Sequence, residues 1–327
     1  MRGTASPLLR AEAGRTLDQL GDPRPEVTTL EHMAFCLVPA GSFELGSNEK
    51  EDKDAYPDEA PRHTYDIPYA YGIGQYPVTQ AQYQRFVEAE DGYTERDNWT
   101  DAGWTWRNSR EVTGPEAYRD PFGLLNHPVV GVSWYEAQAF TVWLTRHAHA
   151  QGWLPSGWQV ALHNEPEWEK AARGGHQLPL HVVVAPLAGF AEQTAPRISK
   201  QNPKPYRRYP WGADSDAQRM NYHSTGIGAT SAVGCFPQGQ SPYGAEELSG
   251  NVLEWSRSRW EEKYPYPKCS SRALHKREAL ESGSRRVLRG GAFDNIRQNV
   301  RAAFRLYNFP NYRDLSVGFR VVLLPPR

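Results

Sequence analysis

Long hydrophobic runs are missing from this chain of 327 residues. No stretch of about 18 apolar residues occurs, and the mean hydropathy is -0.71, so we expect no membrane span. An excess of charge of one sign is missing too. With 37 Lys and Arg residues against 38 Asp and Glu residues, the net charge is -1, which excludes a broad electrostatic surface for nucleic acid or anionic lipid.

Cysteine is scarce. Cys36, Cys235 and Cys269 lie far apart, and no Cys-x-x-Cys spacing occurs. A sparse, odd count neither builds a disulfide framework nor supplies a thiolate zinc site. Residues 1–27 also lack the apolar core of a signal peptide. We therefore expect a cytoplasmic protein.

Familiar catalytic motifs are absent as well. No Gly-rich phosphate loop precedes a predicted helix, and no His-Glu-x-x-His sequence occurs. Gly131-Val-Ser-Trp134 only loosely resembles a nucleophile turn, because the closing Gly is missing, so Ser133 is better explained as a helix N-cap. The position of His127 before Pro128 favours a structural hydrogen-bonding role over that of a base.

The residues that are abundant indicate a folded, loop-rich chain, with 28 Gly, 26 Pro and 12% aromatic residues. N-cap residues and apolar spacing predict helices over residues 7–20, 80–90, 134–150 and 165–173. Short apolar runs at 35–39 and 41–46 predict strands. The fold class is therefore α+β, with a few helices packed on short antiparallel strands and long loops.

One domain over residues 30–327, preceded by a helical extension over residues 1–29, is the simplest organisation. The helix at 7–20 is either the remnant of a helical repeat or a helix packed on the main domain, and we favour the second. The acidic segment 48–59 is predicted to be a solvated loop rather than a metal site. Residues 176–208, apolar and then basic, are predicted to be an insertion whose role the sequence does not give.

Two segments could carry function. In the first, Glu247 and Glu254 flank a Gly250-Asn251 turn, and carboxylates with backbone carbonyls are ligands that calcium takes, although this spacing alone favours solvated acids. The second, residues 289–320, interleaves six Arg residues with aromatics and Asn. Such a mixture can stack on nucleic acid, or it can pin a long loop to carbonyls and carboxylates.

Ordered motifs along the chain resemble the formylglycine-generating-enzyme (sulfatase-modifying factor) family, over roughly residues 32–325. The motifs are Val38–Gly46, Glu59–His63, Pro77–Tyr83, His127–Trp134, Glu165–Gly174, Tyr209–Gly212, Gly250–Trp255, Arg289–Gly291 and Gly318–Arg320. This resemblance implies a C-type-lectin-like fold.

The resemblance also implies a structural calcium ion. By position, the side chains of Glu247 and Glu254 and the carbonyls of Gly250 and Val252 would be its ligands. Asn221 matches a ligand of a second family site, where the acidic ligand is replaced near residues 224–225.

The catalytic residues of the resembled family do not carry over. Its oxidases hold copper through two cysteines, a soft thiolate pair that suits cuprous ion. The matching positions here are Asn295 and Val300, and no cysteine follows Cys269. Related iron-dependent sulfoxide synthases use ligands from an N-terminal helical domain, which we expect this chain to lack. The resemblance therefore implies a protein without copper that is not an enzyme.

Residues 289–320 resemble more narrowly the variable proteins of diversity-generating retroelements. Adenine randomisation turns AAC codons into codons ending in C, which never encode Lys, Glu, Gln, Met or Trp. The candidate variable positions carry none of these residues; they are Phe293, Asp294, Asn295, Ile296, Phe304, Leu306, Tyr307, Asn308, Phe309, Asn311, Tyr312, Asp314, Leu315 and Ser316. The intervening fixed frame comprises Arg297, Arg301, Arg305, Pro310, Arg313 and Gly318–Arg320.

The sequence thus predicts a non-catalytic display protein whose diversified C-terminal surface, about residues 289–320, binds varied protein ligands and no nucleic acid. A divergent oxidoreductase of the same family and an accessory domain of a signalling protein are the alternatives. Phe304 and Leu306 could instead be core residues, and core and surface are equally expected for Phe293. Neither the identity of the ligand nor the oligomeric state follows from the sequence.

Overall fold

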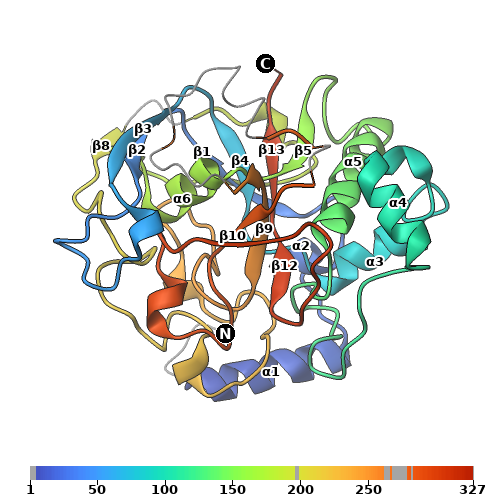
Figure 1. The fold of residues 1–327 in the computed structure, drawn as a ribbon, viewed down its shortest axis with the longest axis horizontal. Coiled ribbons are helices and arrows are strands. Elements are labelled where there is room, and N and C mark those ends of the chain that lie inside the picture. Colours follow the sequence, from blue (N-terminus) through green and yellow to red (C-terminus); the bar gives the residue numbers. More distant parts are fainter. Residues whose placement is uncertain (1–4, 196–198, 261–265, 267–277, 281–282, 327) are drawn as a thin grey trace.

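The computed structural model describes residues 5–195, 199–260, 266, 278–280 and 283–326. Short strands lie in the middle of the molecule, with α3, α4 and α5 along one side (Figure 1). The helices are α1 (Pro7–Leu20), α2 (Pro25–Thr28), α3 (Gln80–Glu88), α4 (Asp101–Ser109), α5 (Trp134–Ala150) and α6 (Glu165–Arg173). The strands are β1 (Ala34–Val38), β2 (Gly41–Leu45), β3 (His63–Ile67), β4 (Tyr71–Gly74), β5 (Gln159–Leu162), β6 (Gln177–Pro179), β7 (Val184–Pro186), β8 (Ser199–Gln201), β9 (Leu253–Arg259), β10 (Arg286–Arg289), β11 (Leu306–Asn308), β12 (Val317–Phe319) and β13 (Val321–Leu324).

All four predicted helices are confirmed, and their caps explain where they begin. Thr79, Ser133 and Asn164 each form a capping box with the residue three positions later, at the start of α3, α5 and α6. Helices α2 and α4 were not predicted from the sequence. The first is a single turn, and the second contains Gly103 and Asn108, which are poor helix formers.

The strands form two main sheets and two small two-stranded sheets. The larger main sheet has the order β5-β13-β4-β1-β7 and the smaller one β11-β10-β9-β12, and the two-stranded sheets are β2-β3 and β6-β8. The predicted strands at 35–39 and 41–46 are confirmed, but they join different sheets because the chain turns at Gly41, whose φ is 120°. The expectation of antiparallel pairing fails for β12, which runs parallel to β9.

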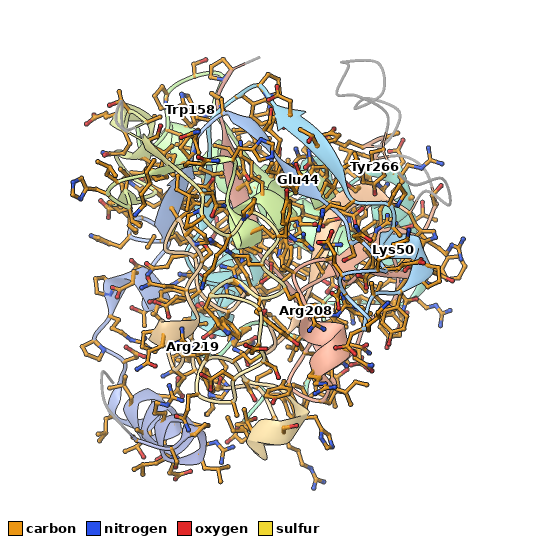
Figure 2. All side chains as sticks on the ribbon, turned by 90° about the vertical axis from the view of Figure 1, so that its left-hand side faces the viewer. Glu44, Lys50, Trp158, Arg208, Arg219 and Tyr266 are labelled. Atoms are coloured by element: carbon orange, nitrogen blue, oxygen red, sulfur yellow. The ribbon has the colours of Figure 1, made fainter. Side chains whose placement is uncertain are left out.

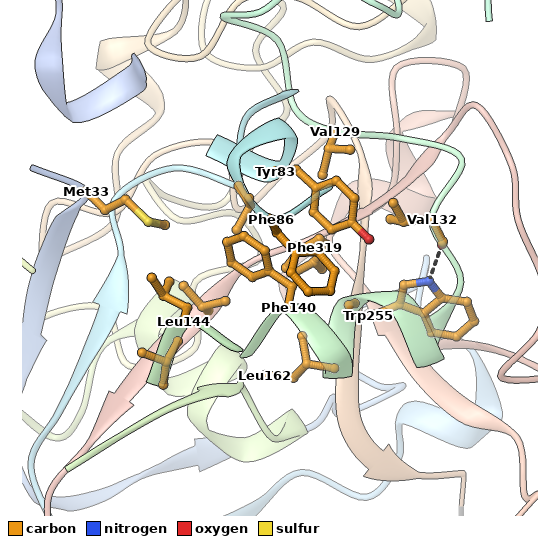
Figure 3. Close-up of a cluster of buried hydrophobic side chains, with 14 of the residues drawn as sticks. Met33, Tyr83, Phe86, Val129, Val132, Phe140, Leu144, Leu162, Trp255 and Phe319 are labelled. Carbon is orange, nitrogen blue, oxygen red and sulfur yellow. Dashed lines mark hydrogen bonds between the residues drawn. The ribbon is translucent and has the colours of Figure 1, made fainter. Parts of the chain in front are cut away.

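The main core lies between the five-stranded sheet and the helices α3 and α5. The rings of Tyr83 and Phe140 stack at 5.5 Å, and Phe319 meets Phe140 edge-on at 5.4 Å (Figure 3). The indole Nε1 of Trp255 donates a hydrogen bond to the Val132 carbonyl at 3.0 Å. Since Phe319 belongs to β12, this core fixes the end of the C-terminal segment.

The N-terminal helix α1 packs on the rest of the domain, as the favoured alternative expects (Figure 1). Its leucines do not form the contact face, because Leu8, Leu9 and Leu20 are exposed. The buried face carries Gly14, which lies against Ala232, together with Pro7, Arg10 and Ala11. None of the helices in the described part of the chain combines the length and apolarity that a bilayer crossing requires.

Candidate ligand-binding surface

The segment 289–320 runs from the end of β10 across the surface and returns into the core as β12. On the way it forms a single turn, Arg297–Val300, and the edge strand β11. Strand β12 pairs with β9 in the register Val317 to Leu253. Regular sheet structure therefore holds both ends of the segment.

Buried arginines hold the middle of the segment. Arg301 donates to the Glu59 carboxylate at 2.6 and 2.8 Å and to Asp52 at 3.0 Å. Arg305 donates to both oxygens of Glu165, at 2.6 and 3.0 Å, and to the Asp58 carbonyl at 2.8 Å. Charge-assisted bonds of this kind are short and directional, so the path of the backbone is well defined here.

The remaining frame arginines behave in the same way, apart from Arg297. Arg313 pairs with Glu136 through Nε at 2.9 Å. Arg289 donates to Glu165 and Glu169, and Arg320 donates to Glu254 and three backbone carbonyls. The Arg297 side chain is exposed. The loop-pinning alternative thus accounts for most of these arginines.

These pairs correct the expectation for the acidic segment 48–59. Glu59 is fully buried and Asp52 is nearly so, because Arg301 needs both as counter-charges. Only part of the predicted solvated loop is solvated. The pairing of Arg301 with Glu59 could not be predicted from the sequence, because about 240 residues separate the two partners.

Most candidate variable positions lie at the surface. Phe309 is the most exposed of the large apolar ones at 59%, and Ile296, Leu306, Tyr307 and Tyr312 are exposed as well. Asp294 and Asn311 are exposed, while Asn295, Asn308, Asp314 and Leu315 are half-buried. Leu306, for which a core position was the alternative, faces solvent.

Three candidate positions are buried, which gives the core alternative for Phe293 and Phe304 and makes the expected display of Ser316 wrong. Phe293 packs its ring against Phe122 at 5.6 Å, and Phe304 packs against Tyr56 at 5.8 Å. The Ser316 carbonyl accepts the Leu253 amide at the junction of β12 with β9. The residue types at these positions do not distinguish buried from exposed side chains, because burial depends on loops far away in the sequence.

The two carboxylates expected to bind calcium differ in how well they suit a cation. Glu247 is buried, and burial raises the pKa of its carboxyl group to about 8, so a cation there would relieve an uncompensated acid. Its oxygens accept from Gly234 and Asn251. Glu254 already pairs with Arg320 at 2.8 Å and accepts a hydrogen bond from the Trp168 indole. Its carboxylate is therefore less suited to bind a cation than that of Glu247.

The other expected calcium ligands, Gly250 and Asn221, already make hydrogen bonds within the protein. The Gly250 carbonyl accepts from the Val252 amide at 3.0 Å, and Gly250 forms a bridge with Asn221. The Asn221 side chain donates to the Ala229 carbonyl and accepts from Thr225. Among the described residues, no group of three His, Cys, Asp or Glu side chains is placed to hold a metal ion.

The positions that match the copper cysteines carry no redox chemistry. The Asn295 side chain accepts from the Ala292 amide, and Val300 is buried beside Tyr209 and Met220. Cys36 and Cys235 are free and buried, and burial raises the pKa of each thiol to about 12, which disfavours the thiolate. Cys269 lies outside the described residues.

His127 is fully buried and meets the Thr230 hydroxyl through Nδ1 at 3.0 Å. Burial lowers the pKa of its imidazole to about 3, so the ring is neutral. This geometry agrees with the predicted structural role.

The architecture defines a C-type-lectin-like α+β domain, and solved structures share it. Treponema denticola variable protein 1 superimposes with a TM-score of 0.57 at 19% identity, over 89% of this chain and 95% of that protein. PvdO from Pseudomonas aeruginosa gives a TM-score of 0.55 at 21% identity, over 88% and 92% of the two chains. At these identities the likeness concerns the fold.

The sequence places the chain in a family. The sequence profile of the sulfatase-modifying factor enzyme 1-like domain matches residues 21–324, and the chain belongs to this family. Hercynine oxygenase of Mycolicibacterium smegmatis is 29% identical over 87% of this chain and 60% of its own length. Hercynine oxygenase of Mycolicibacterium thermoresistibile is 30% identical over 85% of this chain and 56% of its own length. The chain thus spans somewhat over half of these relatives.

A third relative matches along nearly its whole length. Formylglycine-generating enzyme of Thermomonospora curvata is 27% identical over 88% of this chain and 92% of that enzyme. The family therefore includes enzymes.

Proposed function

We propose that this chain is a non-catalytic ligand-binding protein that presents the exposed positions of residues 293–316 to a protein partner. One observation carries the proposal: the segment separates into buried arginines that hold the backbone and exposed apolar side chains between them. Aromatic and aliphatic side chains on a rigid backbone give contact area at a low entropic cost.

A diversity-generating retroelement would vary these exposed positions. The absence of forbidden residues at the candidate positions supports this origin, as does a fold shared with Treponema denticola variable protein 1. The DNA beside the gene provides a direct test. A near copy of the codons for 289–320, with AAC at the candidate positions and a reverse-transcriptase frame nearby, is expected. Its absence would leave a binding surface that is not diversified by this route.

Peptide selection tests the binding surface itself. A phage-displayed random peptide library is panned on the wild-type protein, and enriched peptides are synthesised for affinity measurement. Phe309→Ala and Tyr312→Ala should each weaken binding about tenfold or more. Leu180→Ala, at another exposed apolar position, between β6 and β7, is the control and should bind normally. No enrichment, or unchanged binding by both variants, would contradict the proposal.

The enzymatic relatives define the competing function, an oxidoreductase. Such a protein would retain iron or copper in near-stoichiometric amount after purification. We expect elemental analysis to find neither, because the copper positions carry Asn295 and Val300. The free cysteines Cys36 and Cys235 suit a reducing cytoplasm, where we propose that the protein acts.

Calcium is the cofactor we propose, bound at Glu247 and the neighbouring carbonyls. Addition of calcium after chelation should raise the melting temperature, and magnesium at the same concentration should not. Glu247→Gln should remove the effect because it removes the carboxylate that a cation would neutralise. A melting temperature that ignores calcium would argue against a site here.

A further inference from the structure

Tyr56 lies beside the C-terminal segment although it belongs to the loop between β2 and β3. Its ring lies 5.8 Å from that of Phe304, and its hydroxyl donates to Asn299 at 2.9 Å. The side chain is 38% exposed. Neither Tyr56 nor Asn299 is among the candidate variable positions.

Trp260 lies beside the same segment from another side, directly after β9. Its ring lies 4.5 Å from Tyr307, and the guanidinium of Arg305 lies 4.4 Å above it. Its amide donates to the Arg285 carbonyl at 2.8 Å, which fixes the backbone. Trp260 as a whole is half-buried.

The buried arginines connect these two rings. Arg305 contacts Trp260 and also donates to the Asp58 carbonyl, in the loop that carries Tyr56. Arg301 lies 6.0 Å from the Tyr56 ring and binds Glu59 in that loop. Cation–π contacts and ion pairs therefore hold both rings in place before any partner arrives.

We propose that Tyr56 and Trp260 are constant contact residues that border the varied surface, and that the partner is a protein segment placing an apolar side chain against them. This inference rests on the proposed function. If the exposed positions between 293 and 316 change, some variants will carry Asn, Ser or Asp, which bury little apolar area. Rings outside the segment retain apolar contact area in every variant, and their fixed position limits the entropy lost on binding.

A second display surface provides the test. Leu306, Phe309 and Tyr312 are replaced together by Ser, a residue that codons ending in C encode, and peptides are selected separately on this protein and on the wild type. Tyr56→Ala and Trp260→Ala are then introduced into both backgrounds. Each should weaken binding of both peptide sets about fivefold or more, since the contacts are shared.

Matched controls separate contact from folding. Trp158 is also half-buried, and it lies at a corner of the molecule away from Lys50 and Tyr266, which mark the Tyr56 loop and the Arg305 side of the surface (Figure 2). Trp158→Ala should bind as the wild type does. Tyr56→Phe, which keeps the ring, should also bind normally, and Trp260→Leu replaces Trp260→Ala if the latter melts at a lower temperature.

The outcomes distinguish this inference from the proposed function. Loss of binding in Phe309→Ala with full binding in Tyr56→Ala and Trp260→Ala would overturn the inference and leave the display function standing. Loss confined to one peptide set would overturn it too, because the contacts would then not be constant. Failure of the wild type to enrich any peptide would contradict both the proposed function and this inference.

Discussion

Each buried arginine between residues 289 and 320 is matched to carboxylates or carbonyls from distant parts of the chain. Burial of a charge is costly, and only a partner with good geometry offsets that cost. Arg301 meets this condition with two contacts to Glu59 and one to Asp52. At the scale of single residues, the display segment is therefore held by electrostatic pairs rather than by its own apolar side chains.

Removal of one such partner should unfold the surface. Arg301→Met leaves the buried Glu59 without its ion-pair partner and weakens the pairing of Asp52, which keeps Arg208, so we expect a loss of about 3–5 kcal/mol in the free energy of unfolding. Chemical denaturation measures it. Arg297→Met, at an exposed position of the same segment, should change the value by less than about 0.5 kcal/mol. Equal effects of the two substitutions would refute the pinning role.

His127 should make the protein sensitive to mild acid. Its pKa falls from 6.5 in the unfolded chain to about 3 in the folded one, so the unfolded state binds a proton first as the pH falls. The stability that neutral His127 provides is present above pH 6.5 and is lost towards pH 3.

His127→Gln removes this titration. Between pH 7 and pH 5 the wild type should lose about 2 kcal/mol more than the variant. Denaturation curves at the two pH values give the difference. Parallel losses in both proteins would mean that the folded-state pKa of His127 is close to its ordinary value.

Local sequence determines most of the helices and little of how they pack. Thr79, Ser133 and Asn164 place the starts of α3, α5 and α6 because a cap is a contact between near neighbours in the sequence. The docking face of α1 could not be predicted, because Gly14 rather than a leucine lies against the domain. A small residue there becomes meaningful only when Ala232, more than two hundred positions later, is brought beside it.

The docking of α1 depends on the small size of that residue. A Cβ at Gly14 would lie 2.7 Å from the Ala232 Cβ, so Gly14→Leu should overpack the contact and cost about 1–3 kcal/mol. Amide hydrogen exchange over residues 7–20 should then become faster. Glu12→Leu places the same side chain on the exposed face and should leave exchange unchanged. Slow exchange in Gly14→Leu would show that the helix adapts without moving.

At the scale of the whole molecule, ordered motifs predicted the fold well, whereas the composition of the surface was only partly predictable. Residues such as Phe304 and Phe309 are alike in sequence, yet one is 6% and the other 59% exposed. Tyr56 covers the first and nothing in the described part of the chain covers the second to that extent. That distinction arises from a loop about 250 residues away, which no local pattern records.

The molecule should accept extensive change at its exposed positions. Replacement of Ile296, Leu306, Phe309 and Tyr312 together by Ser should cost less than about 2 kcal/mol in total, because exposed sites contribute little each. By contrast, Phe304→Ser alone should cost about 3–5 kcal/mol, because it leaves a cavity beneath Tyr56. Thermal melting compares the two proteins. A collapse of the fourfold variant would show that the exposed side chains support the fold.

The positions of the ion-pair partners along the chain also have a consequence during translation. Glu59, Glu136 and Glu165 leave the ribosome before residues 289–320, which supply the arginines that neutralise them. A chain cut short by a frameshift or stop codon in this segment keeps acids that have no counter-charge, cannot complete its core and is open to proteolysis. Only a chain translated in the correct frame to its end contains these arginines. Changes to the codons of this segment therefore yield stable protein only when the final arginines are still encoded.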